Sequence, residues 1–175
     1  MRFAYADPPY LGQGARHYGK LHAAAADCDN PEWHRALIER LCAEFPDGWA
    51  LSLHTPSLRT ILNMCPEDVR VCAWVKPFAS FKPNVTRAYA WEPVIVRGGR
   101  PIPKTQPTVR DFVSEPIAMR KGFPGAKPYG FSFWLFRWLN LKADDEFVDL
   151  FPGSGSVMEA YRAWLASPTL FGEAA

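Results

Sequence analysis

The sequence predicts a single α/β domain built on a mostly parallel sheet. Short apolar runs alternate along the chain with segments of helical periodicity, which is typical of parallel strands joined by crossover helices. The length of 175 residues corresponds to one domain. Hydrophobic residues make up 48% and charged residues 22% of the chain, a composition that excludes disorder as its main state.

Strands and helices are expected where turn residues interrupt these apolar runs. The clearest helix start is Asn30-Pro31-Glu32, which supplies a capping side chain, a proline at the first helical position and an acid in the first turn. Apolar residues then recur at helical spacing until Pro46-Asp47-Gly48. We expect further helices at residues 57–64, 131–141 and 156–166, of which the nearly all-apolar segment 131–141 should be buried on most sides. Strands are expected at residues 1–6, 49–54, 69–75, 89–96 and 146–150, and a loop at residues 11–29.

The net charge of +2 conceals a strong asymmetry along the chain. Residues 76–127 carry a net charge of +7, between flanking segments that are both acidic. Such a distribution is expected of a protein that contacts phosphate locally, although a solvated basic loop without a partner is the alternative. Prolines recur through residues 98–128 and exclude a central strand or a helix interior there. We therefore expect a basic, proline-rich insertion at residues 98–126.

Several classes of protein are excluded early. No stretch approaches the ~20 apolar residues that span a bilayer, and the N-terminus meets Asp7 and two prolines too soon for a signal peptide. The cysteines show no C-x-x-C spacing, so neither a zinc site nor a redox dithiol is indicated. The histidines lack the spacing of metal ligands as well. We expect a cytoplasmic protein without a metal, its thiols reduced: Cys28, Cys42, Cys65 and Cys72.

A glycine-rich turn follows the expected strand at residues 146–150. Its glycines let the backbone approach a ligand, and its amide groups lie at the start of the next helix, where anions bind. In open α/β sheets, ligands bind at the carboxyl ends of the strands. A turn that merely needs glycine is the alternative. The dinucleotide fingerprint and the P-loop are both excluded, because a third spaced glycine and a Gly-Lys-Ser/Thr sequence are missing.

The turn Asp7-Pro8-Pro9-Tyr10 is the more specific signal. Its two prolines fix the backbone and carry no amide donors, so the carbonyl groups of the turn are free to accept hydrogen bonds. Asp7 adds a carboxylate acceptor and Tyr10 adds a ring. This combination suits the exocyclic amino group of a nucleobase that is flipped out and stacked on the tyrosine. A purely structural Pro-Pro turn between a strand and a loop is the alternative.

These motifs together resemble the S-adenosylmethionine-dependent amino-methyltransferases, which methylate adenine N6 or cytosine N4. Asp7-Pro8-Pro9-Tyr10 is similar to the catalytic motif of the family, and residues 149–155 are similar to its cofactor turn. The segment Gly125-Ala126-Lys127-Pro128 resembles the K-P segment that precedes the cofactor turn, and residues 74–76 and 91–95 resemble strands between the motifs. A catalytic motif that comes first and a cofactor motif that comes last are the order of the circularly permuted, β-like class.

The resemblance implies a fold and a set of roles. The fold is a Rossmann-like methyltransferase sheet, mostly parallel with one antiparallel strand and helices on both faces, in a minimal form. Asp7 and the Pro8 carbonyl would accept hydrogen bonds from the target amine, Pro9 would fix the turn and Tyr10 would stack on the base. S-adenosyl-L-methionine (SAM) would be held by Asp149 near its amino group, Lys127 near its carboxylate, Glu173 at its ribose, and the turn formed by Phe151, Pro152, Gly153, Ser154 and Gly155.

The function implied is methyl transfer to adenine N6 in DNA. Aspartate at the first motif position favours adenine over cytosine, and Tyr10 favours DNA over RNA. An RNA adenine-N6 methyltransferase, a cytosine-N4 enzyme, another base modification and a non-catalytic nucleic-acid-binding subunit remain alternatives. The insertion at residues 98–126 would be the target-recognition loop, and phosphate contacts are expected from Arg97, Arg100, Lys104, Arg110, Arg120 and Lys121. Besides DNA, the candidate partners are a second copy of this chain in a homodimer, or a partner subunit that completes a shortened sheet.

Overall fold

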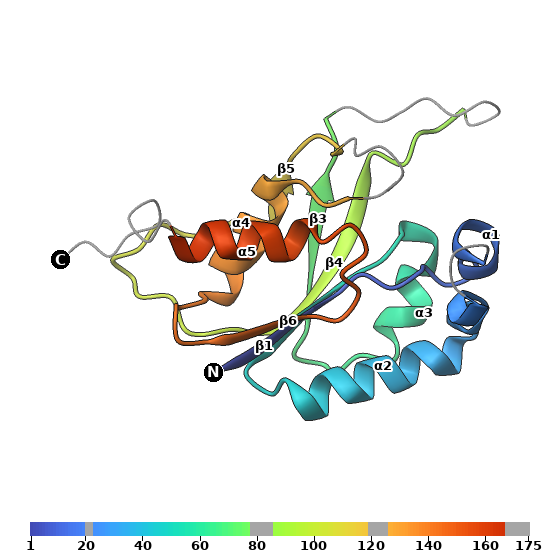
Figure 1. Cartoon of the computed structure of the whole chain (residues 1–175), viewed down its shortest axis with the longest axis horizontal. Coiled ribbons are helices and arrows are strands. Elements are labelled where there is room, and N and C mark those ends of the chain that lie inside the picture. Colours follow the sequence, from blue (N-terminus) through green and yellow to red (C-terminus); the bar gives the residue numbers. More distant parts are fainter. Residues whose placement is uncertain (20–22, 78–85, 119–125, 167–175) are drawn as a thin grey trace.

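A mixed sheet forms the centre of the molecule. The computed structural model describes residues 1–19, 23–77, 86–118 and 126–166. Its six-stranded sheet has the order β5-β3-β4-β2-β1-β6 (Figure 1). The strands are β1 (Arg2–Ala6), β2 (Gly48–Ser52), β3 (Arg70–Val75), β4 (Trp91–Gly98), β5 (Phe112–Ser114) and β6 (Glu146–Asp149). β4 runs antiparallel to both of its neighbours, and the other paired strands are parallel, which confirms the single antiparallel strand that was expected.

Helices cover both faces of this sheet, as predicted. The elements are α1 (Gly14–Tyr18), the 3₁₀ helix η1 (Ala23–Asp29), α2 (Pro31–Glu44), the 3₁₀ helix η2 (Thr55–Ser57), α3 (Leu58–Leu62), α4 (Tyr129–Leu139) and α5 (Ser156–Ala166). In Figure 1, α2 and α3 lie on one face, and α4 and α5 lie on the other. Alternate residues of β1 serve the two faces: Phe3 and Tyr5 pack toward α4 and α5, and Ala4 and Ala6 toward α2 and α3.

The two helices with the strongest sequence signals form as predicted. The Asn30 side chain accepts a hydrogen bond from the Glu32 amide at 3.0 Å and thereby caps α2, with Pro31 at the first helical position. α4 buries an aromatic stripe against the sheet, and Phe136 meets the rings of Phe147 and Tyr161 edge to face. Asn140 ends α4 in the left-handed conformation at φ 53°, which asparagine adopts more easily than most residues.

The expectation of a loop at residues 11–29 is wrong, because this segment contains α1 and η1. The Asp29 carboxylate, at the end of η1, accepts hydrogen bonds from the amides of Gly14 at 2.6 Å and Ala15 at 3.0 Å. These amides belong to the first turn of α1, which has no partners for them within the helix. A cap that comes from fifteen residues away in the chain leaves no periodic signal in the sequence.

Smaller differences concern the ends of elements. The strand expected at residues 89–96 is β4, displaced by two residues, and the helix expected at residues 57–64 is divided between η2 and α3. The proline-rich segment contributes a strand of three residues, β5, which pairs with β3 at the edge of the sheet. Prolines exclude a central strand and tolerate a short edge strand, so β5 agrees with that physical limit. Within the described ranges, no helix is long and apolar enough to cross a bilayer.

Replacing Leu41 by alanine should destabilise the fold strongly. Leu41 is fully buried (0% exposed) between α2 and the sheet, so its truncation leaves a cavity and should lower the free energy of unfolding by about 2–5 kcal/mol. Urea denaturation followed by circular dichroism measures this change. Leu165→Ala is the matched control, because Leu165 is 37% exposed on α5 and its truncation should cost less than about 1 kcal/mol. Equal losses in the two variants would contradict the assignment of the core.

Candidate active site at the carboxyl ends of the strands

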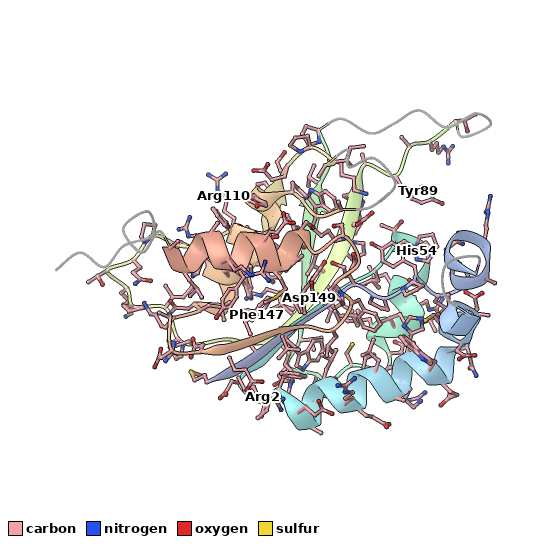
Figure 2. All side chains as sticks on the ribbon, viewed as in Figure 1. Arg2, His54, Tyr89, Arg110, Phe147 and Asp149 are labelled. Carbon is pink, nitrogen blue, oxygen red and sulfur yellow. The ribbon has the colours of Figure 1, made fainter. Side chains whose placement is uncertain are left out.

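The motifs that are distant in the sequence meet at one edge of the sheet. The turn at Asp7–Tyr10 follows β1, and the glycine-rich turn at residues 150–155 follows β6, which is the parallel neighbour of β1. The Leu150 amide donates to the Tyr5 carbonyl at 2.9 Å, so the two strands stay paired up to the point where both turns begin. Figure 2 shows Phe147 and Asp149 along β6, with His54 farther in the same direction and Arg2 below Phe147, at the start of β1.

Four charged side chains alternate in sign beside the Asp7 turn. The Lys127 ammonium lies 2.9 Å from Asp7 Oδ2 and 3.5 Å from Glu92 Oε2, and the Lys76 ammonium pairs with the other oxygen of Glu92. The Lys127 side chain is only 4% exposed. Glu92 is the second residue of β4, and an antiparallel strand begins at the edge where its parallel neighbours end. The direction of β4 therefore delivers Glu92 to this site.

Burial and the neighbouring charges shift the pKa values of Asp7, Glu92 and Lys127 in opposite directions. Burial raises the pKa of Asp7, and the neighbouring Lys127 only partly offsets that rise. Burial also disfavours the charged form of Glu92, but Lys127 and Lys76 together outweigh it, so the pKa of Glu92 is lowered. For Lys127, burial is outweighed by Asp7 and Glu92, so its pKa is raised. Of the two carboxylates, Asp7 therefore takes up a proton more readily than Glu92.

Tyr10 is fixed at its hydroxyl and on one face of its ring. The hydroxyl donates to Glu92 Oε2 at 3.0 Å and lies 3.4 Å from Asp7 Oδ1. The His54 ring is stacked on Tyr10 with the centroids 5.3 Å apart and an interplanar angle of 19°. His54 Nδ1 lies 2.8 Å from the Ser57 hydroxyl, which holds the imidazole, and burial lowers the pKa of His54. The aromatic ring of Tyr10 is therefore presented in one orientation.

Trp74 forms the floor of the charged cluster. The ammonium groups of Lys76 and Lys127 lie 4.7 Å and 5.2 Å from the centroid of its ring, within the range of cation–π attraction. The indole Nε1 donates to the Glu115 carbonyl at 2.8 Å, which fixes the plane of the ring. Trp74 thus replaces part of the hydration that both lysines lose on burial.

The glycine-rich turn has the backbone conformation that its sequence predicts. Gly153 and Gly155 have φ values of 45° and 74°, in the left-handed region that glycine adopts without steric cost. A Cβ atom at Gly155 would meet nothing within 4 Å, so conformation and not space requires glycine there. The Gly155 amide donates to the Pro152 carbonyl at 2.6 Å and closes the turn just before α5 begins.

Asp149 carries a carboxylate oxygen that the described parts of the chain leave unused. Its Oδ1 accepts from the Phe151 amide at 3.2 Å, whereas its Oδ2 is buried without a hydrogen-bond partner. Burial raises the pKa of Asp149 to about 6, and the charge of Asp7 adds to that rise. A buried acceptor without a partner is costly, so this position favours a ligand that carries a positive charge or a hydrogen-bond donor.

The remaining expected cofactor residues differ in their surroundings. Phe151 packs toward α2, with its ring centroid 6.0 Å from that of Trp33. Pro152 is exposed, and the Ser154 hydroxyl bonds to the hydroxyl of Ser156 at the start of α5. Glu173 lies outside the described residues.

The four described basic residues that were expected to contact phosphate lie away from this site. Arg97 is paired in register with Trp49 near the start of β2 and forms an ion pair with Asp68 at 2.8 Å. Arg100 forms an ion pair with Asp145 at 2.6 Å, and Lys104 follows it in the same loop. At roughly 3.3 Å per residue, Arg97 lies about 16 Å along β4 from Glu92. Arg110 stacks over Phe112 beside α4, on the far side of the sheet from α3 (Figure 2). Arg120 and Lys121 lie outside the described residues.

Sequence reasoning missed four side chains that define the site: Lys76, Glu92, Trp74 and His54. The resemblance marked the segments at residues 74–76 and 91–95 but assigned no role to a side chain in them. Glu92 had a usable signal, since a carboxylate beside Pro93 at the start of an otherwise apolar strand is costly unless it is paired. His54 had none, because its stacking on Tyr10 depends on how β1 and β2 are joined in the sheet.

Comparisons with known proteins agree on the fold. No protein-family model matches the chain, and no curated protein matches it either. Among solved structures, M1.HpyAVI in complex with SAM has a TM-score of 0.59 at 15% identity, over 93% of this chain and 77% of that chain. TTHA0409 from Thermus thermophilus, a candidate DNA modification methylase solved with S-adenosyl-L-methionine, has a TM-score of 0.55 at 17% identity, over 93% and 77% of the two chains. The expected methyltransferase fold is confirmed.

Replacing Asp149 by asparagine should stabilise the ligand-free protein at neutral pH. The folded-state pKa is raised to about 6, so the ionised group costs stability above pH 6, and the cost disappears below about pH 4, where both states are protonated. Asp149→Asn should therefore raise the free energy of unfolding by about 1–2 kcal/mol at pH 7.5 and by much less at pH 4. Thermal unfolding at both pH values measures this, with Asp144→Asn, an exposed neighbour, as the control. A loss of stability at pH 7.5 would contradict the unpartnered state of Asp149.

Proposed function

We propose that this protein is a SAM-dependent methyltransferase that acts on adenine N6 in DNA. The observation that carries the proposal is the meeting of two turns at one edge of the sheet. One turn offers the acceptors of Asp7 and Pro8, and the other offers a glycine-rich backbone beside the unused oxygen of Asp149. The first suits an amine, and the second suits a cationic small molecule.

The residues of the second turn fit SAM. Bound SAM supplies a methyl group on a positively charged sulfur and carries an ammonium group, for which Asp149 Oδ2 is an unused acceptor. Phe151, Pro152, Gly153, Ser154 and Gly155 would surround its methionine part. Lys127 has three N–H donors, so it remains our candidate for the SAM carboxylate while it stays paired with Asp7 and Glu92. Glu173 remains a proposed contact with the ribose.

Asp7 and Pro8 would hold the attacking amine. An exocyclic amino group has two N–H donors, and the Asp7 carboxylate and the Pro8 carbonyl are two acceptors on one rigid turn. Hydrogen bonds of this kind orient the nitrogen lone pair and stabilise the positive charge that develops on nitrogen during transfer. Burial raises the pKa of Asp7, which makes it a better acceptor for the proton that the methylated amine must lose.

Glu92 and His54 would act by positioning Tyr10. Glu92 accepts from the Tyr10 hydroxyl and His54 covers one face of its ring, so the ring is oriented before a base arrives. No other aromatic ring packs on Tyr10 in the part of the chain that the structure describes. A flipped adenine stacked on the exposed part of this ring would bring N6 toward Asp7.

DNA contacts are proposed near the same edge. Arg87 and Tyr89 are exposed just before β4, and the Lys76 amide donates to the Ala90 carbonyl at 2.8 Å, which fixes this segment beside the charged cluster. Figure 2 labels Tyr89 on the side of the molecule where His54 lies. We therefore add Arg87 and Tyr89 to Arg120 and Lys121 as proposed phosphate and base contacts. The distant Arg97, Arg100, Lys104 and Arg110 would contact DNA only if it extended past the sheet.

The decisive experiment follows the methyl group to its product. The protein is incubated with labelled SAM and unmodified DNA, and the DNA is digested to nucleosides. Label in N6-methyldeoxyadenosine is the expected result. Label in N4-methylcytosine, or label only when RNA replaces DNA, would contradict the assignment of the substrate. Nucleic-acid binding without any label and without SAM binding would favour a non-catalytic subunit.

Replacing Asp7 by alanine should abolish transfer and retain SAM binding. Loss of the acceptor removes charge stabilisation from the reacting nitrogen, so the rate should fall by a factor of about 100 or more. The dissociation constant for SAM, measured by calorimetry, should change by less than about tenfold, because Asp7 does not belong to the glycine-rich turn. Retained activity in Asp7→Ala would contradict its catalytic role, and loss of SAM binding would move Asp7 to the cofactor site.

The affinity for SAM should rise as the pH increases through about 6. Above that pH Asp149 is ionised and attracts the SAM ammonium, whereas below it the carboxyl is neutral. Calorimetry between pH 5 and pH 8 should give a dissociation constant that decreases toward the higher pH and levels off above about pH 7. In Asp149→Asn the affinity should be weaker and independent of pH over this range. An unchanged pH dependence in the variant would contradict the contact.

A further inference from the structure

A second recess lies at the end of the sheet opposite the candidate active site. Its volume is about 520 Å³, within the range of small-molecule sites. Its walls come from the first residue of β3, the loop that follows β4 and the last turn of α4. In Figure 1 the chain after β4 passes on the left, where β1 begins, whereas the Asp7 turn follows the other end of β1. The two sites are therefore separated by the length of the strands.

The recess is strongly basic. Arg70, Arg100 and Lys104 line it, and no acidic side chain among the described residues does. Arg100 is neutralised by Asp145, whose side chain is fully buried. Arg70 and Lys104 are both exposed, and neither forms an ion pair with a carboxylate in the described parts of the chain. Two uncompensated positive charges at the rim of one recess favour an anion, and arginine and lysine both bind phosphate readily.

Flat surfaces accompany these charges. The Arg70 guanidinium lies over the Trp138 ring at the wall of the recess, 5.6 Å from the ring centroid. A guanidinium held in this way offers its outer face to another planar ring, and bases stack on arginine in many nucleic-acid complexes. Gln106 and Thr108 add hydrogen-bonding groups to the lining. The recess thus suits an anion that carries a flat, polar ring.

The loop that forms the recess is held in place before any ligand arrives. The Asn140 side-chain amide donates to the Pro101 carbonyl at 2.8 Å, and the Arg100 amide donates to the Leu139 carbonyl at 3.0 Å. The Trp134 indole donates to the Arg110 carbonyl at 2.9 Å, which fixes the other end of the loop on α4. Prolines within the loop restrict its backbone further. A loop anchored at both ends loses little conformational entropy on binding.

We propose that this recess binds a nucleotide, with the phosphate held by Arg70 and Lys104 and the base against Arg70 and Trp138. The proposal does not depend on methyl transfer, because no described residue of the candidate active site lines the recess. Two sources share this chemistry: a free nucleoside phosphate, and a nucleotide within a single strand of nucleic acid. Both present a phosphate and a base at the same spacing.

Calorimetric titration with AMP, adenosine and a single-stranded adenine oligonucleotide tests the proposal. We expect AMP to bind at least tenfold more tightly than adenosine. Arg70→Ala and Lys104→Glu should each weaken AMP binding by about tenfold or more. Replacing Arg70 removes a contact with Trp138 and could change the wall of the recess. Lys104→Glu provides an independent test, because Lys104 is exposed and makes no ion pair within the described ranges. Arg162→Ala, an exposed cation on α5, is the control and should leave the affinity unchanged.

The arms of this experiment distinguish the outcomes. Tighter binding of the oligonucleotide than of AMP, weakened by the same two variants, assigns the recess to a nucleic-acid strand, and the reverse order assigns it to a free nucleotide. Equal binding of adenosine and AMP would overturn the role of the phosphate. Binding that Asp7→Ala abolishes and Lys104→Glu leaves intact would place AMP at the other site and overturn the proposal. Absence of binding by all three probes would overturn it as well.

Discussion

The pairing of the buried Lys127 ammonium with Asp7 and Glu92 is the interaction on which the arrangement of the site depends. It joins the turn after β1, the start of β4 and the segment before α4. Burying a charge is costly unless it is paired, and a pair whose partner is removed leaves an uncompensated charge. With four alternating charges and the Trp74 ring beneath them, each ion replaces the hydration of its neighbours. The same pairing that stabilises these side chains fixes the oxygens of Asp7 where an amine would meet them.

The single antiparallel strand makes this pairing possible. In a wholly parallel sheet, the first residues of every strand lie at the edge opposite the ligand-binding edge. β4 runs the other way, so its first residues contribute Glu92 at the active edge, and its last residues lead into Gly98, Gly99 and Arg100 at the opposite edge. The two ends of β4 therefore lie in different electrostatic surroundings. One end lies in the cluster of alternating charges, and the other lies beside an excess of positive charge. Among the described residues of the basic segment 76–127, Lys76 and Lys127 lie at the first end, and Arg97 and Arg100 lie at the second.

What the sequence predicted correctly were the features governed by local chemistry. The cap at Asn30, the burial of α4 and the tight turn after β6 follow from short-range preferences, whereas the single antiparallel strand was implied by the family resemblance. What it missed depends on contacts between distant residues. α1 is capped by Asp29 from across a loop, Glu92 reaches Lys127 from another strand, and Arg97 and Arg100 face carboxylates that their own segment does not contain. A run of basic residues in the sequence does not show where each residue lies in the fold. The direction and order of the strands determine which end of the sheet each residue reaches.

Asp149 carries a cost in stability that a bound ligand would remove. An unpartnered, buried carboxylate oxygen lowers the stability of the free protein, and an asparagine or a hydrophobic residue would avoid that cost. The neighbouring Asp7 increases the cost by repulsion, although Lys127 lies close enough to oppose it. Burying an unpartnered charge costs free energy in the ligand-free protein. A ligand of opposite charge removes this cost, and the free energy that it removes adds to the affinity for the ligand. The two carboxylates therefore differ: Asp7 is paired with Lys127 within the fold, whereas Asp149 Oδ2 has no partner among the described residues and would be neutralised by the cationic ligand that we propose.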